Sequence, residues 1–184
     1  MGAYTRIPAD VFNNLQLDAG VIVTTFDPTN PSIADSDIIT ATTGGIQISV
    51  VPTYSDVFED VDNAPLNTKE GKHLDSWEVR LSTTSLSSSK DIIKRSLGAA
   101  DVSGNKITPR AGLEQGDFAD IWWVGDKADG GWAAAKIMNS LSTGGLQWQT
   151  SKNGKGQTAL EIMGHPSISS QTVVPAEFYV GAGG

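Results

Sequence analysis

Few side chains of this 184-residue chain stand at spacings that suggest chemistry. The two histidines, His73 and His165, do not form the i, i+4 pair of a helical metal site, so we expect each in a loop or at a strand end. The chain has no cysteine, which excludes a disulfide scaffold, a zinc-thiolate site and a cysteine nucleophile. Nucleophile-elbow, Walker, dinucleotide-binding and zinc-protease motifs do not occur. The sequence therefore predicts no catalytic residue, no metal site and no cofactor.

The densest group of carboxylates lies in a polar segment, residues 55–73. A calcium loop needs oxygen ligands at fixed spacing around a central glycine, and this segment has neither. The segment is therefore a solvated loop or an interface arm, in which its lysines would pair with carboxylates of a neighbouring chain. Its polar members are Asp56, Glu59, Asp60, Asp62, Asn63, Lys69 and Lys72.

Two other groupings invite a functional interpretation. Trp122 and Trp123 are adjacent, so in a strand they face opposite sides. We expect one to enter a core and the other to lie under a partner or a covering loop, with a sugar-binding platform as an alternative. Glu78 and Glu161 could form a glycosidase pair, but no other feature of the sequence supports one.

Composition restricts the choice of partners. Thirteen Lys and Arg against 21 Asp and Glu give a net charge of -8, which does not favour general attraction to nucleic acid or anionic lipid. No apolar run reaches the ~20 residues of a membrane span, and the N-terminus lacks the pattern of a signal peptide. Only 18% of residues are charged, while Ser, Thr and Gly are abundant. This balance favours an all-β chain with many turns, or surfaces that contact other protein.

Short apolar runs of period two, separated by Gly, Asp, Asn and Pro, predict a chain of strands. The one exception is residues 88–97, where Ile92, Ile93 and Leu97 share a helical face. Ser88 and Asp91 have the spacing of a capping box, and Gly98 follows as a helix end prefers. We therefore expect one short α-helix packed on a β-fold. The expected strands are residues 20–26, 46–54, 74–86, 118–124, 132–138, 146–150, 158–163 and 175–180.

An internal similarity suggests how these strands pair. Residues 42–48 (TTGGIQI) resemble residues 142–148 (STGGLQW), and each copy opens a strand that is followed by another. Asn153 and Gly154 predict a tight turn in the second pair. We expect two related hairpins that lie side by side in one sheet.

Alternation divides that sheet into two faces. The apolar face, expected to be core, includes Ile48, Val79 and Leu160, and also Trp77 and Trp148. The opposite face is polar and suits water or a wet channel, with Arg80 as its only clear cation. The polar residues proposed to line it are Gln47, Ser49, Glu78, Arg80, Gln147, Gln149, Gln157 and Glu161.

Several segments, in order, resemble the major tail protein of long-tailed bacteriophages of Gram-positive hosts. They span about residues 13–180. The segments are residues 14–20 (NLQLDAG), 42–45 (TTGG), 59–63 (EDVDN), 74–78 (LDSWE), 98–101 (GAAD), 120–126 (DIWWVGD) and 138–145 (MNSLSTGG).

The resemblance implies a mainly β fold: a β-sandwich or partial barrel with a flanking α-helix (88–97) and a long interface loop (55–73). It implies one tail tube domain over 1–184, with 1–12 and 181–184 as flexible or interface arms. Such subunits form hexameric rings that stack into a hollow tube, and four strands from each subunit join a β-barrel around the lumen. The polar face would then line the lumen, and residues 55–73 would contact the next subunit or ring.

The same resemblance implies partners and location. The chain would assemble with itself and with tape-measure, tail terminator and tail-tip proteins, in the host cytoplasm and then in the virion tail. DNA would pass through the lumen without specific binding, and no membrane would be involved. Two alternatives remain open: a tube protein of a contractile injection or secretion machine, and a monomeric carbohydrate-binding β-sandwich.

Overall fold

The computed structural model describes residues 7–182, whose strands form an antiparallel sheet of nine strands and a separate two-stranded hairpin. The prediction of a mainly β chain with one short α-helix is confirmed. The order in the large sheet is β2-β1-β7-β8-β10-β4-β3, with β11 also paired to β8 and β9 to β10. The elements are η1 (Ala9–Asn14), β1 (Gln16–Val23), η2 (Asp35–Asp37), β2 (Ile38–Thr40), β3 (Thr42–Asp56), β4 (Lys72–Ser85), α1 (Lys90–Leu97), β5 (Ala100–Ser103), β6 (Lys106–Pro109), η3 (Gln115–Asp117), β7 (Ala119–Lys127), β8 (Trp132–Ser142), β9 (Gln147–Gln149), β10 (Gln157–Gly164), η4 (Ile168–Ser170) and β11 (Ala176–Gly181).

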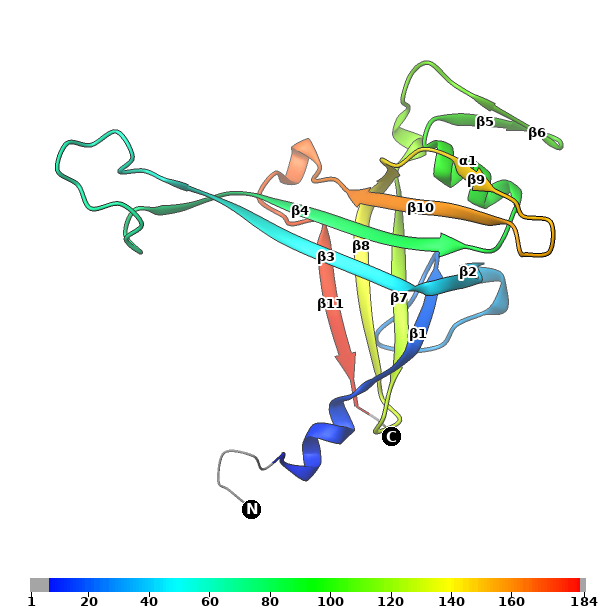
Figure 1. The fold of residues 1–184 in the computed structure, drawn as a ribbon, viewed down its shortest axis with the longest axis horizontal. Helices are drawn as coiled ribbons and strands as arrows, with labels where there is room; N and C mark the ends of the chain where they lie inside the picture. The colour runs from blue at the N-terminus through cyan, green and yellow to red at the C-terminus, as the bar shows by residue number, and fades with distance from the viewer. Residues whose placement is uncertain (1–6, 183–184) are drawn as a thin grey trace.

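The large sheet folds into two halves that are connected through the end of strand β8. Strands β2, β1, β7, β8 and β11 form the first half, and β9, β10, β4 and β3 form the second. The halves are joined where Ser142 and Leu141 at the end of β8 pair with Ile162 and Met163 of β10. In Figure 1, β3, β4 and β10 cross in front of β7, β8 and β11. The result is a sandwich-like body that is closed only along one side.

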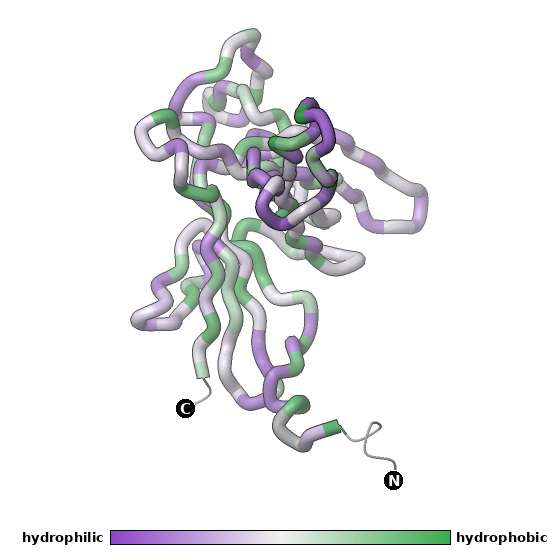
Figure 2. The backbone as a smooth tube through the Cα atoms, turned by 90° about the vertical axis from the view of Figure 1, so that its left-hand side faces the viewer, coloured by the Kyte–Doolittle hydropathy of each residue, from purple (hydrophilic) through white to green (hydrophobic). Residues whose placement is uncertain are grey.

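The main core lies between the two halves. Figure 2 shows green hydrophobic stretches along the strands of the first half, with purple residues at the turns that join them. Strands of both halves turn alternate apolar side chains inward, as the period of two predicted. The fully packed members are Ile22, Ile121 and Ile137 from the first half, and Val79, Leu81, Leu160 and Ile162 from the second.

A second, smaller core covers the outer face of the first half. Phe26, in the loop after β1, packs edge-on to Trp122 with ring centroids 5.7 Å apart. Trp122 is 8% exposed there, while Trp123 points to the opposite side and packs against the main core. The two tryptophans therefore face opposite sides as predicted, and the loop supplies the expected cover. Neither offers an exposed platform for a sugar.

Helix α1 begins two residues later than predicted. Ser89, rather than Ser88, is the N-cap, and its hydroxyl accepts a hydrogen bond from the Ile92 backbone N–H at 3.3 Å. The spacing to Asp91 predicts Ser88 as the cap, but Ser89 is the residue that reaches the free N–H groups of the first turn. Gly98 ends the helix with a φ of +74°, a conformation that glycine adopts without steric cost.

The two sequence-related hairpins lie side by side, as predicted. Strands β3 and β4 form one hairpin and β9 and β10 the other, with β4 and β10 paired at the centre. The register pairs Ile48 with Leu81 in the first hairpin and Thr158 with Trp148 in the second. The second hairpin closes through a turn in which the Gly154 N–H donates to the Ser151 carbonyl.

The β3–β4 hairpin continues well beyond the body and is the most extended feature of the molecule (Figure 1). We call residues 51–77 the arm. The expected loop 55–73 is shorter than predicted, because Ser55 pairs with His73 and Asp56 with Lys72. Only residues 57–71 form the loop at the tip.

The predicted terminal arms fall partly outside the described residues, namely at residues 1–6 and 183–184. Within the described part, Ala9–Asn14 form the short helix η1, whose Val11 and Phe12 are exposed. Gly181 belongs to the sheet, since it pairs with Trp132 of β8. Between residues 7 and 182, no helix is both long enough and apolar enough to cross a membrane.

Candidate functional surfaces

The second half of the sheet presents one polar face. Cross-strand pairs point to the same side of a sheet, and the register pairs Ser49 with Arg80, Glu161 with Ser82, and Gln157 with Gln149. All the residues proposed to line a lumen therefore share one face of the strands β9-β10-β4-β3, opposite the main core. They are Gln47, Ser49, Glu78, Arg80, Gln147, Gln149, Gln157 and Glu161.

The charges on this face nearly balance. The Arg80 guanidinium contacts the Glu78 carboxylate at 2.5 Å, and this hydrogen bond, with the nearby charge of Glu161, raises the pKa of Arg80. The face thus carries two carboxylates and one guanidinium, and the guanidinium is paired with one of these carboxylates. Glu78 is therefore held in an ion pair, which does not suit it to be the acid of a glycosidase. Among the described residues proposed for this face, Arg80 is the only Lys or Arg, and it is paired with Glu78, so the face has little with which to retain a polyanion.

The sheet that bears this face has two open edges. Among residues 7–182, β3 pairs only with β4, and β9 pairs only with β10. An open strand edge presents unpaired N–H and C=O groups to any strand that approaches it. Gly44 and Gly45, near the start of β3, have φ of +78° and +87° and lie where its register with β4 shifts.

At the tip of the arm, Asp56 organises the loop. Its carboxylate accepts hydrogen bonds from the backbone N–H groups of Phe58 (3.0 Å) and Asn67 (2.7 Å), which lower its pKa. Lys72 donates to the Asn67 side chain at 2.8 Å and lies 3.9 Å from the Asp56 carboxylate. The sequence missed this role, because Asn67 comes close to Asp56 only through the folding of the loop.

The other polar side chains predicted near the tip of the loop point to solvent. Glu59, Asp60, Asp62 and Asn63 are exposed, whereas the Asp56 side chain is only 12% exposed. The lysines expected to pair with another chain have contacts within their own: Lys72 as described, and Lys69 with Glu70 at 3.6 Å. No group of acidic or histidine residues in the described chain is arranged to hold a metal ion.

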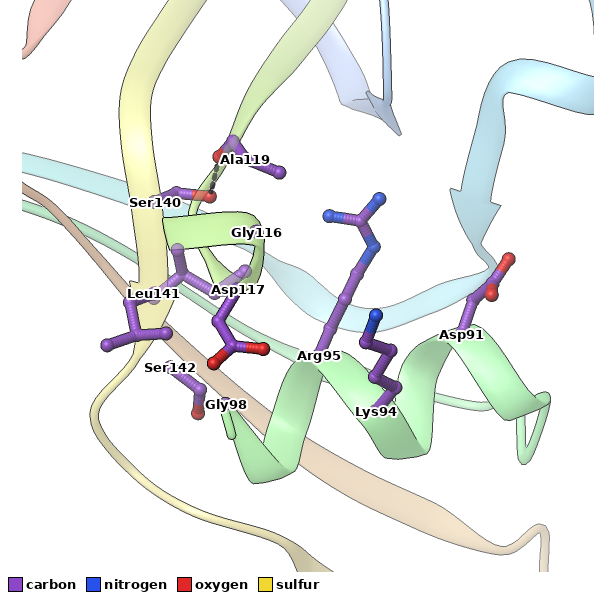
Figure 3. A pocket seen from close by; sticks show the side chains of 11 residues that line it. Asp91, Lys94, Arg95, Gly98, Gly116, Asp117, Ala119, Ser140, Leu141 and Ser142 are labelled. Atoms are coloured by element: carbon purple, nitrogen blue, oxygen red, sulfur yellow. Dashed lines mark hydrogen bonds between the residues drawn. The ribbon is translucent and has the colours of Figure 1, made fainter. Parts of the chain in front are cut away.

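A small cavity of about 160 Å³ lies between α1, β8 and η3 (Figure 3). Asp117 on its wall accepts a hydrogen bond from the Glu114 backbone N–H and forms an ion pair with Arg110, and both contacts lower the pKa of Asp117. The Ser140 hydroxyl donates to the Ala119 carbonyl at 2.5 Å, as the dashed line in Figure 3 shows. A second serine of the lining, Ser142, has a buried hydroxyl without a hydrogen-bond partner among the described residues. The lining includes no histidine that could serve either serine as a base.

The histidines occupy ordinary structural positions. His165 Nδ1 lies 3.2 Å from the Asn139 carbonyl oxygen, and its ring packs edge-on to Phe118. His73 is exposed on the arm, opposite Ser55. Both lie at strand ends or in loops, as the sequence predicted.

Two tryptophans do not follow the sequence prediction. Trp77 and Trp148 were expected in the core, but they are 36% and 54% exposed. Their strands continue past the region where the first half of the sheet covers the second. Alternation places them on the apolar face, but no layer of the described chain buries them there.

Comparison with known proteins gives weak structural similarities only. No family model matches the sequence, and no curated protein matches it. Among solved structures, a chain in the virion of a native gene transfer agent particle aligns with 15% identity and a TM-score of 0.43 over 81% of this chain and 92% of that chain. A chain in the tail of an empty gene transfer agent particle, described with C6 symmetry, aligns with 12% identity and a TM-score of 0.38 over the same shares. At these scores the alignments carry no argument about individual residues or function.

Proposed function

We propose that this chain is the tail tube protein of a phage-type tail: a structural protein that forms hexameric rings, stacked into a hollow tube through which DNA passes. The observation that carries the proposal is the second half of the sheet. The polar residues proposed to line a lumen share one face, the packed apolar residues share the other, and both of its outer strands, β3 and β9, have open edges. The sequence resemblance to major tail proteins supports the same assignment.

Ring closure follows from the two edges. If β3 of one copy pairs with β9 of the next, the contact is heterologous and repeats around a ring. Pairing of this kind removes the unpaired strand edges and produces a continuous barrel, with four strands contributed by each subunit. The main core, which lies on the opposite face of these strands, would then face outward.

The polar face would line the lumen. Its few charges leave one carboxylate in excess over the Arg80–Glu78 pair, so phosphate groups find no cation to bind. A neutral to weakly acidic wall lets DNA move along the tube without being retained. In this proposal the chain is a single structural domain with no enzymatic activity and no cofactor. Tape-measure, terminator and tail-tip proteins would be its further partners, in the virion tail.

Two alternatives make different predictions. A tube inside a contractile injection machine would have the same subunit architecture and differ by a surrounding sheath. A monomeric carbohydrate-binding sandwich was suggested by the adjacent tryptophans, but Trp122 is buried under Phe26 and Trp123 packs on the main core. Trp148, in the hairpin of β9 and β10, is exposed, and it is the aromatic residue through which this carbohydrate-binding alternative stays open.

Electron microscopy of the purified protein tests the proposal directly. The protein is held at high concentration for days and imaged in negative stain, with and without a tail-tip extract to nucleate assembly. Hollow tubes or six-fold rings are the expected result. A variant in which residues 57–71 are replaced by Asn-Gly should remain a folded monomer.

A protein that stays monomeric under both conditions would overturn the proposal. Binding to a glycan array that is lost in Trp148→Ala would then support the carbohydrate-binding alternative. Tubes formed equally well without residues 57–71 would leave the tube assignment intact but remove the assembly role of the arm tip.

A further inference from the structure

The sandwich is open on the side where strand β3 forms its edge. In Figure 1, β3 crosses β11, β8 and β7, and all three strands continue past it. An apolar groove of about 360 Å³ follows this open side, between β3 and the inner face of the first half of the sheet. The residues that line it are Ile46, Ile48, Val50, Trp123, Ala135 and Phe178.

Strand β11 leaves apolar side chains uncovered in and beside this groove. Phe178 pairs with Ala135 and Val180 with Ala133, in the same register that pairs Ala176 with Ile137 of the main core. Phe178 and Val180 therefore point to the side of the main core, yet they are 61% and 72% exposed. A contiguous exposed apolar surface of this kind marks an interaction site more often than scattered single residues do.

An exposed aromatic group lies at the opposite edge of the second half of the sheet. Trp148 alternates with Gln147 and Gln149 and lies opposite the buried Thr158, so it points away from the proposed lumen. Its indole is 54% exposed. When β9 of one copy pairs with β3 of the next, the two strands share their faces. Trp148 then stands on the side of β3 that borders the groove, whatever the stagger between the two strands.

The directions of the strands allow this pairing. The register places Trp148, Thr158, Ser85 and Thr42 in one row across β9, β10, β4 and β3. Each neighbouring pair in the row is antiparallel, so β9 and β3 run in opposite directions. A copy related by rotation about a ring axis therefore presents its β9 antiparallel to β3, and the four-strand unit repeats without a break in the pattern.

The charges beside the two edges are opposite. The turn after β9, residues 150–156, contains Lys152 and Lys155 and no acidic residue. The segment between β1 and β2, residues 24–37, contains Asp27, Asp35 and Asp37 and no lysine or arginine. Figure 1 shows the β9–β10 turn and strand β2 at the same end of the second half of the sheet. Edge pairing between copies would therefore bring the lysine turn toward the acidic segment.

We propose that the groove beside β3 receives Trp148 of the next copy in the ring, with its indole against Phe178 and its lysine turn facing residues 24–37. The proposal rests on the tube assignment, which gives the strands that meet, and adds the side chain that seals the open sandwich. Each subunit would then complete the core of its neighbour. Exposed ion pairs are weak and screened by salt, whereas a buried pair of aromatic rings supplies the apolar area that they lack.

Because the chain has no cysteine, engineered thiols can test the position of the turn. Full-length Lys152→Cys is mixed with full-length Asp35→Cys at high concentration and oxidised, and the products are separated on a non-reducing gel. The expected result is a mixed disulfide dimer at a yield several-fold above that of the control mixture, Lys152→Cys with Asp60→Cys, whose second thiol lies at the tip of the arm. A yield equal to that of the control would overturn the proposal.

Substitution of the two aromatic groups gives a second, independent measurement. Full-length Trp148→Ser and Phe178→Ser should each raise the protein concentration needed for assembly about tenfold or more, because buried aromatic groups carry much of the binding energy of a contact. Trp148→Phe should recover most of the loss. The control is Ile168→Ser, at an 87% exposed position outside the groove, which should leave assembly unchanged.

Sedimentation velocity measures assembly of these variants, and circular dichroism checks that each is folded. Folded Trp148→Ser and Phe178→Ser chains that assemble as readily as the Ile168→Ser control would show that the groove does not receive the indole.

The failures of the two proposals are distinguishable. If the wild-type chain forms rings or tubes while the mixed disulfide forms no better than the control, the tube assignment stands and the groove proposal is wrong. If neither rings nor tubes form but the mixed disulfide forms well above the control, the contact between copies is real and the tube assignment is wrong.

Discussion

The indole Nε1 of Trp123 donates a hydrogen bond of 2.9 Å to the carbonyl oxygen of Ala19. This bond joins the middle of β7 to the irregular part of β1, where the register between the two strands shifts. The neighbouring Gly20 has a φ of +68°, and a Cβ there would overlap the Val124 carbonyl and the Trp123 ring. The bulge in β1 thus brings its backbone directly onto the indole and completes that part of the main core.

Gly20→Ala should therefore destabilise the fold. The left-handed backbone costs about 1–2 kcal/mol for alanine, and the overlap with packed groups adds about 1–3 kcal/mol. Gly44→Ala is the matched control, because Gly44 has a φ of +78° but an added Cβ would meet no atom within 4 Å beyond its chain neighbours. Urea unfolding followed by tryptophan fluorescence measures both free energies of unfolding. Equal losses in the two variants would show that the contact with Trp123 is unimportant.

Asp56→Ala should loosen the loop of the arm without unfolding the body. The change removes the acceptor of the Phe58 and Asn67 N–H groups and leaves Lys72 without its carboxylate. Amide hydrogen exchange of residues 57–71 should become faster, while exchange in β7 and β8 stays the same. Asp60→Ala, at an exposed position of the same loop, is the control and should change neither. Unchanged exchange in Asp56→Ala would mean that other contacts hold the loop.

The order of this loop should depend on pH in the acidic range. Folding lowers the pKa of Asp56, because two backbone N–H groups donate to its ionised form. A lowered pKa contributes stability that is complete above the unfolded value of about 4 and is lost as the pH falls through the folded value. Exchange in the loop, corrected for intrinsic rates, should be constant at neutral pH and rise at strongly acidic pH. Asp56→Asn removes the titration, so its loop should not show this rise.

Lysines on the polar face should convert the proposed lumen into a DNA-retaining surface. Gln47→Lys, Gln149→Lys and Gln157→Lys add three cations to a face whose only guanidinium is paired. Tubes of this variant should assemble normally and co-sediment with short duplex DNA in a salt-dependent manner. The control is Gln115→Lys with Gln171→Lys, which adds cations at exposed positions off this sheet. Equal DNA retention by the control would argue against the lumen assignment.

Much of the fold was predictable because alternation and turn chemistry are local. The strand around Ile48 and the turn at Gly154 follow from neighbouring residues, as does the helix that ends at Gly98. The short strand β2 and the hairpin of β5 and β6 were missed. Their runs of three and four residues are too short to show a period. The start of β1 was missed because Gln16 to Gly20 has little apolar pattern, and its pairing depends on β7.

The sequence by itself determined which side chains share a face: the alternation that separates Gln47 from Ile48 holds wherever the strand is placed. Only the tertiary structure decided which parts of each face are covered. Trp77 and Trp148 obey the same alternation as Leu81 and yet are exposed, because the first half of the sheet ends before it reaches them. Side-chain direction is a property of the local backbone, whereas burial requires a second layer, and the position of that layer is set by contacts between residues far apart in the chain.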